Sequence, residues 1–96
     1  AIPEGYEGQI RARSSLGKKG LILPHSIGTI DSDYRGDLFV LMTWIGEGDS
    51  YVIEKGERIA QMVIAPIPKA RFREVDLEHL GQTKRGEGGF GSTGRF

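Results

Sequence analysis

The chain contains no cysteine, so neither disulfide bonds nor thiolate chemistry can contribute to its structure or activity. It has no excess of charge of either sign, because 13 basic and 13 acidic side chains cancel. A neutral chain argues against general binding to nucleic acid or to a membrane surface. No apolar run approaches the roughly 20 residues of a membrane helix, and no signal peptide opens the sequence. We therefore expect a cytoplasmic domain with neither a nucleic-acid nor a membrane partner.

Motifs of several common functional classes are missing as well. No cluster of side chains has zinc-like spacing, no Gly-x-Gly-x-x-Gly follows a strand, and there is no Walker phosphate loop. The two histidines, His25 and His79, are isolated in the sequence. We expect the first to lie in a loop and the second at the surface.

The chain is instead a succession of short apolar stretches punctuated by glycine and proline. In residues 5–13, apolar or small residues alternate with polar ones, which predicts a half-buried strand. Residues 20–24 are a short apolar run stopped by proline, and residues 37–45 have the composition of a buried central strand. Residues 50–67 predict two strands joined by a turn at 55–56.

The remainder predicts little further regular structure. Residues 70–77 are a candidate for one more strand, and 76–81 form at most a helical turn. Many short strands with regular punctuation predict an all-β fold, an antiparallel barrel or jelly roll. Five or six strands are too few to close such a barrel, and the chain opens on Ala1 as though already inside a strand. We therefore expect a chain that is incomplete at its N-terminus or completed by a partner.

Two polar stretches early in the chain are candidates for chemistry. The sequence "GTIDSDYRGD" at 28–37 is either an ordinary hairpin turn or a site in which Asp31 is a general base and Tyr34 a flat surface for a ligand. The sequence "RARSSLGKKG" at 11–20 is either a solvated basic loop or a phosphate cradle of guanidinium, hydroxyl and backbone N–H groups.

Two later features leave the same kind of choice. Gln61 sits in an otherwise apolar strand, where its amide either faces outward or binds a partner. Five glycines in the last twelve residues, 85–96, make the end of the chain unsuited to a core. This tail is either a disordered terminus or a segment whose backbone wraps phosphates while Phe90 stacks on a base. An RNA-binding tail is disfavoured by its few basic residues.

Taken together and in this order, these stretches resemble the motifs of the trimeric dUTPases, which split dUTP into dUMP and diphosphate. "RARSSLG" resembles the second family motif, "GTIDSDYRGD" the third, "KGERIAQMV" the fourth and "RGEGGFGSTG" the fifth. The resemblance implies a jelly-roll-like β-barrel domain in 1–80 and a flexible glycine-rich lid in 81–96. It also implies a homotrimer with shared active sites, dUTP as substrate and Mg²⁺ held by phosphates and water, with no direct protein ligand.

The resemblance assigns roles to individual residues. Asp31 would activate the attacking water, and Tyr34 would pack on the deoxyribose and exclude a ribose. The phosphates would be held at the second, fourth and fifth motifs, with Phe90 over the uracil. The implied substrate-binding residues are Arg13, Ser14, Ser15, Gly28, Ile30, Tyr34, Gln61, Arg85, Phe90, Gly91 and Ser92.

Some departures from the family pattern keep two other interpretations open. The first motif, whose aspartate binds waters on the metal, is absent, and Ala12 and Ser15 replace the usual proline and glycine of the second. His25 stands where many bacterial members carry asparagine. A catalytically impaired deoxynucleotide-binding relative is one alternative. A dCTP deaminase, or a bifunctional enzyme with both deaminase and dUTPase activity, is the other, although the glutamate that deaminases need after the third-motif turn is missing.

Overall fold

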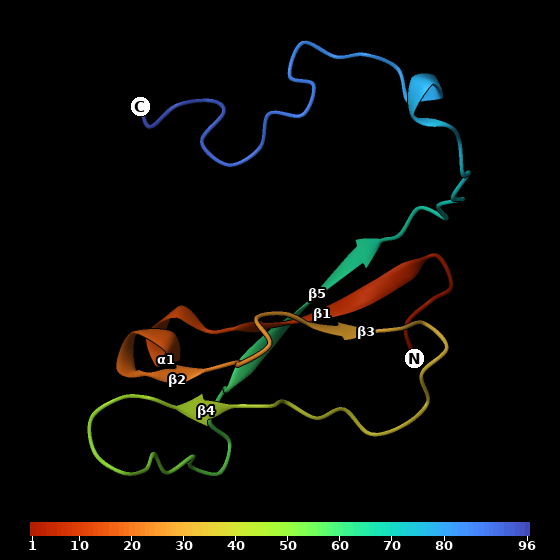
Figure 1. Ribbon diagram of the computed structural model, residues 1–96. Helices are drawn as coiled ribbons and strands as arrows, with labels where there is room; N and C mark the ends of the chain where they lie inside the picture. The colour runs from red at the N-terminus through yellow and green to blue at the C-terminus, as the bar shows by residue number, and fades with distance from the viewer.

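The regular structure of the computed structural model, which describes residues 1–96, consists mainly of β-strands separated by long irregular segments (Figure 1). No helix is both long and apolar enough to cross a membrane. The strands are β1 Tyr6–Ala12, β2 Leu21–Ile22, β3 Gly28–Ile30, β4 Thr43–Trp44 and β5 Ala60–Pro66; the helices are α1 Ser14–Lys19 and the single 3-10 turn η1 Leu77–His79.

The strands form two antiparallel sheets, which confirms the predicted all-β, antiparallel class. β1 lies between β3 and β5, so that Gly8 faces Ile30 on one side and Ile64 on the other. β2 and β4 form the second sheet, in which Leu21 faces Trp44. A Cβ on Gly8 would lie 3.2 Å from Ile30 Cβ. Glycine at this position therefore lets the neighbouring side chains close over the centre of the larger sheet.

Helix α1 replaces the loop predicted for residues 11–20. Its one buried side chain is Leu16, which joins Ile10, Leu21 and Leu23 in the core. Gly20 ends the helix with φ of 114° and donates its N–H to the carbonyls of Leu16 and Gly17. This left-handed C-terminal cap favours glycine. The loop prediction failed because one apolar side chain in a polar stretch was enough to hold a helical turn against the core.

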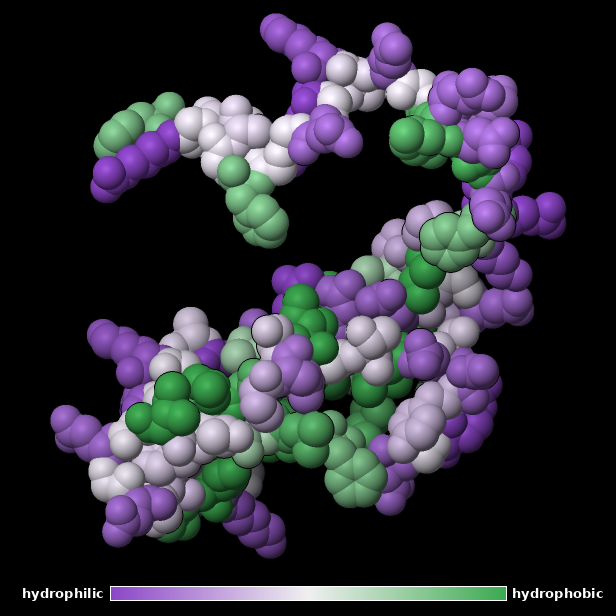
Figure 2. All heavy atoms as spheres, in the orientation of Figure 1, coloured by the Kyte–Doolittle hydropathy of each residue, from purple (hydrophilic) through white to green (hydrophobic).

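The predicted buried strand at 37–45 is wrong for most of its length. Only Thr43–Trp44 pairs with another strand, and Phe39 is 74% exposed. The strands predicted at 50–54 and 70–77 are also unpaired. A strand requires a neighbouring ladder, and no other strand of this chain lies beside these segments. Many of their apolar side chains consequently remain exposed, and Figure 2 shows hydrophobic atoms at the surface both of the folded body and of the arm that leaves it.

The chain leaves the folded body after β5 and runs away from both sheets (Figure 1). Its Cα radius of gyration is 19.7 Å, whereas a compact domain of this length would have about 12–13 Å. The predicted helical turn near 76–81 is confirmed by η1. The tail at 85–96 has turns but neither helix nor strand, as the sequence predicts, and Phe90 is fully exposed.

Candidate active site

A small polar pocket, called the Arg13–Gln61 pocket below, lies where the C-terminal end of β1 meets the N-terminal end of β5. Arg11 faces Gln61 across the ladder, and Gln61 Nε2 donates to Ala12 O at 3.5 Å. Beyond Ala12 the chain turns at Arg13 into α1, which begins at Ser14. The resulting pocket has a volume of about 100 Å³ and is lined by four of the predicted site residues: Arg13, Ser14, Ser15 and Gln61. Sheet pairing thus brings together two polar segments that lie far apart in the sequence.

The lining of this pocket is rich in hydrogen-bond donors. A guanidinium, two hydroxyls and an amide face it, and it has no apolar lining residue. No carboxylate forms an ion pair with Arg13. Guanidinium and hydroxyl groups together are suited to phosphate oxygens. The pocket therefore has the chemistry of a binding site for a phosphate or a similar oxyanion.

Asp31 follows β3 directly and begins a turn that its own residues stabilise. Tyr34 N donates to Asp31 O at 3.2 Å, and Tyr34 Oη donates to Asp37 O at 2.6 Å. A Cβ on Gly36 would collide with the Tyr34 hydroxyl, so glycine leaves room for the ring. The hairpin alternative is wrong, because the residues after the turn do not pair with β3.

A second pocket opens beside this turn. Its volume is about 190 Å³, and it is lined by Thr29, Ile30, Asp31, Tyr34, Asp37, Leu38 and Phe39. The carboxylate of Asp31 and the ring of Tyr34 therefore share one concave surface. Gly28, at the start of β3, lies next to His25, since a Cβ there would be 3.1 Å from His25 Cε1. His25 is exposed in a loop, as predicted.

The remaining predicted residues lie elsewhere in the single chain. Arg85, Phe90, Gly91 and Ser92 belong to the tail and line neither of these pockets. Arg85 Nε instead donates to Gly88 O within the tail. The predicted site is thus divided among the Arg13–Gln61 pocket, the Asp31–Tyr34 pocket and the tail.

Sequence reasoning missed a cluster made by Trp44, Tyr51 and Glu57. Tyr51 Oη donates to Glu57 Oε1 at 2.6 Å, and Glu54 N donates to Glu57 Oε2 at 3.0 Å. The hydrogen bond from Tyr51 lowers the pKa of Glu57, and the same bond raises the pKa of Tyr51. The ring centroids of Trp44 and Tyr51 are 5.1 Å apart. The signal that could have predicted this hydrogen bond was a tyrosine and a glutamate on either side of the predicted turn at 55–56.

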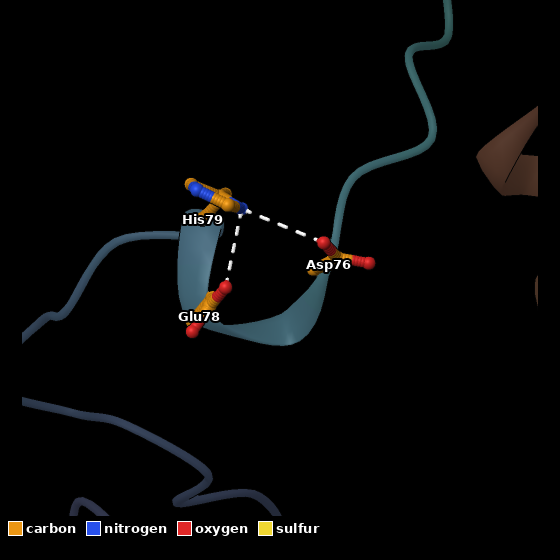
Figure 3. A group of neighbouring side chains, drawn as sticks. All are labelled: Asp76, Glu78 and His79. Carbon is orange, nitrogen blue, oxygen red and sulfur yellow. Dashed lines mark ion pairs between the residues drawn. The ribbon is translucent and has the colours of Figure 1, made fainter.

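Three possible metal ligands gather at η1 (Figure 3). His79 Nδ1 lies 3.9 Å from Asp76 Oδ2 and 4.0 Å from Glu78 Oε1, and all three residues are exposed. His79 is therefore at the surface as predicted, although it is not isolated. The Arg13–Gln61 pocket has no carboxylate, so its side chains do not fit a directly bound divalent cation.

The fold and the pockets define an all-β protein that assembles polar side chains from distant segments at the ends of its strands. The sequence model of one family, described as dUTPase, matches residues 1–94. The chain belongs to the dUTPase family.

Relatives with curated descriptions and a solved structure agree with this assignment. The chain is 55% identical over 94 residues to the deoxyuridine 5′-triphosphate nucleotidohydrolase of Rhizobium etli, covering 97% of this chain and 58% of that protein. It is 59% identical over 96 residues to the protein of that description in Dinoroseobacter shibae, covering 99% and 60%. A structure of Staphylococcus bacteriophage 80alpha dUTPase with dUPNHPP is 34% identical, covers 99% of this chain and 70% of its own, and has a TM-score of 0.77. The chain thus spans less than two thirds of the length of these curated relatives. The likeness to the phage structure confirms the jelly-roll-type class predicted for the fold.

Proposed function

We propose that the protein hydrolyses dUTP to dUMP and diphosphate, which would limit uracil incorporation into DNA and supply dUMP for thymidylate synthesis. The observation that carries this proposal is the donor-lined pocket formed by Arg13, the two serines of α1 and Gln61. The names of the relatives support it, since they are nucleotidohydrolases of deoxyuridine triphosphate. The phage enzyme was solved with dUPNHPP.

The phosphates of the substrate would occupy the Arg13–Gln61 pocket. Donors from the guanidinium, the hydroxyls and the amide would bind phosphate oxygens and offset the negative charge that repels an attacking water. Because no carboxylate lines this pocket, Mg²⁺ would arrive as part of the substrate complex, held by phosphate oxygens and water.

Asp31 would be the general base. Its carboxylate takes a proton from a water molecule, whose oxygen forms a bond to the α-phosphorus while the bond to the bridging oxygen breaks. The bridging oxygen leaves with the diphosphate, and dUMP remains. Tyr34 would pack on the deoxyribose, and the backbone of Gly28 and Ile30 would face the uracil.

We further propose that the active form is a homotrimer, because the single chain divides the site into three parts. The tail would reach a site formed by other copies, since it runs away from its own sheets (Figure 1). It would bring to that site Arg85, Phe90, Gly91 and Ser92. Exposed apolar side chains such as Phe39 and Leu41 on the folded body are surfaces that partner copies could cover.

Release of diphosphate from dUTP tests the proposal, with UTP, dTTP and dCTP as competing substrates. We expect turnover of dUTP alone, at a rate that Arg13→Ala reduces. A chain that releases diphosphate equally from all four nucleotides, or from none, would not have the proposed activity.

A deoxynucleotide-binding protein without turnover is the second candidate, because Asp31 and Arg13 line different pockets in the single chain. It predicts calorimetric binding of a non-hydrolysable dUTP analogue with no diphosphate release. Ammonia release from dCTP would instead indicate the deaminase.

A further inference from the structure

The turn that precedes Gln61 is stabilised from inside by one side chain. Glu57 accepts the hydroxyl proton of Tyr51 with one carboxylate oxygen and the Glu54 N–H with the other. The backbone N–H of Glu57 donates in turn to Glu54 O at 3.1 Å. A single carboxylate therefore joins both ends of residues 51–57, immediately before the strand that carries Gln61.

The same cluster contacts the part of the chain that carries the other side of the pocket. Tyr51 lies against Trp44 of β4, whose Nε1 donates to Gly48 O at 3.2 Å. Next to Trp44, Ile45 N donates to Gly20 O at 2.8 Å. Gly20 caps α1, the helix that presents the two pocket serines. Contacts thus run without a gap from α1 through β4 and Tyr51 to Glu57.

Gln61 needs such support because of its place in the sheet. It is the second residue of β5, next to the last pair of the ladder, Ala12 with Ala60. Ladder ends open more readily than their centres. The hydrogen bond of Gln61 to Ala12 O is long, at 3.5 Å, so it holds the amide weakly. Only three residues separate Glu57 from Gln61, and movement of the turn would therefore move the amide.

We propose that Tyr51 and Glu57 are positioning residues, which fix Gln61 relative to Arg13 and the serines of α1 in the Arg13–Gln61 pocket. The inference rests on the proposed function, because it assigns these residues a role in the same site. The charge of Lys19, in the last turn of α1, also acts on Glu57: it contributes to lowering the pKa of that carboxyl, after the hydrogen bonds from Tyr51 and Glu54. Glu54 is the other charged group that acts on the pair.

The test compares Tyr51→Phe and Glu57→Gln with Glu54→Gln as the matched control. Tyr51→Phe keeps the ring on Trp44 but removes the hydroxyl donor. The side chain of Glu54 accepts none of the hydrogen bonds described for this turn, so its exchange removes a neighbouring charge only. Two measurements are made on each variant: kcat/KM for dUTP, and the affinity for inorganic diphosphate by calorimetry.

We expect Tyr51→Phe and Glu57→Gln to reduce kcat/KM by roughly 10- to 100-fold, the order expected for a misplaced substrate-binding group. Glu54→Gln should stay within about twofold of the unchanged protein. The double variant should lose less than the sum of the two single losses, because Glu57→Gln leaves one acceptor oxygen for two donors and Tyr51→Phe removes one of those donors. Emission from Trp44, the one tryptophan of the chain, should stay the same in Tyr51→Phe, which would separate displacement of the amide from general unfolding.

Two outcomes would overturn the proposal. One is unchanged kcat/KM and unchanged diphosphate affinity in Tyr51→Phe; the other is equal loss in Glu54→Gln, which would indicate a general effect on the turn. If the unchanged protein does not hydrolyse dUTP, the proposed function fails, yet diphosphate affinity still tests positioning. In that case weaker diphosphate affinity in Tyr51→Phe and Glu57→Gln, but not in Glu54→Gln, supports the positioning role, and equal affinity in all variants contradicts it.

Discussion

Asp31 is held at the end of β3 by a turn whose hydrogen bonds use the backbone and the neighbouring Tyr34, which leaves its carboxylate facing a pocket. Asp31→Asn preserves the shape of the side chain but removes the proton acceptor. Hydrolysis of dUTP should fall by roughly 10²- to 10⁴-fold, as for loss of a general base. Calorimetry with a non-hydrolysable analogue should show nearly unchanged binding. Turnover close to that of the unchanged protein would remove Asp31 from the mechanism.

The hydrogen bond between Tyr51 and Glu57 predicts two pH limits for its contribution to stability. The pKa of Glu57 is lowered from 4.5, so the contribution is complete above pH 4.5 and is lost as the pH falls through the lowered value. The pKa of Tyr51 is raised from 10.0, so the contribution is complete below pH 10.0 and is lost as the pH rises through the raised value. Lys19 and Glu54 act in the same directions on Glu57 and Tyr51, respectively.

Urea unfolding of the unchanged protein and of Tyr51→Phe across this range checks both limits. The difference between their unfolding midpoints should be constant between the two limits and should shrink beyond each of them. Because both groups lie near the solvent, the difference itself should be small. A difference that does not vary with pH would contradict the linkage of this hydrogen bond to the ionisation of Glu57 and Tyr51.

At the scale of elements, the junction between α1 and β4 depends on two glycines. Gly20 adopts φ of 114°, and a Cβ there would collide with the backbone of Gly46. Gly20→Ala should therefore destabilise the protein by more than the left-handed conformation alone, which costs roughly 1–2 kcal/mol. The control is Gly48→Ala, where φ is 79° and nothing lies within 4 Å of the added Cβ.

Denaturant unfolding of these two variants separates strain from collision. Gly48→Ala should show the conformational cost only, and Gly20→Ala a larger loss. Equal losses would show that the backbone of the α1–β4 junction moves apart without further cost.

Sequence patterns predicted elements well where the signal was local. The alternation in residues 5–13 gave β1, the prolines at 66 and 68 marked the end of β5, and the glycines of the tail excluded regular structure. The pattern misled at 37–45, because composition indicates a strand but cannot supply its partner. Helix α1 was missed because its single apolar contact, Leu16, depends on the tertiary fold.

The candidate site likewise contains residues that could be predicted from sequence motifs and arrangements that could not. Arg13, Ser14, Ser15 and Gln61 were predicted by resemblance to family motifs, and the structure places these four in one pocket. The positions of Asp31 and Tyr34 in a second pocket could not be predicted, since they depend on how β3 pairs with β1. The Tyr51–Glu57 bond was not predicted either, because it requires the geometry of the turn rather than a motif.

At the scale of the whole molecule, the tail makes no contribution to the core. Deletion of residues 85–96 should therefore leave thermal stability without ligand almost unchanged, because these residues are exposed apart from a half-buried Gly88. The same deletion should strongly reduce the proposed dUTP hydrolysis, since it would remove the proposed stacking of Phe90 on the uracil, a contact worth roughly 1–3 kcal/mol per base. A truncated chain that hydrolyses dUTP as fast as the full one would reduce the tail to a passive terminus.

The proposed closure of the tail over a site can be tested by fluorescence. Phe90→Trp should report it once Trp44, the one native tryptophan, is replaced by phenylalanine. In that background, a dUTP analogue with Mg²⁺ should change the emission of the new indole and protect the tail from proteases. Constant emission and unchanged cleavage would contradict closure.

The separation of the tail from its own sheets has a genetic consequence. If the tail acts on another copy, damage to the body and damage to the tail can be compensated between chains. Asp31→Asn chains retain a sound tail, and chains truncated after residue 84 retain a sound Asp31. Mixed and reassembled, these two inactive populations should regain part of the activity, whereas neither does so alone. In a cell carrying both alleles, such pairs would complement each other, and inheritance of the defect would depend on which part of the chain each allele affects.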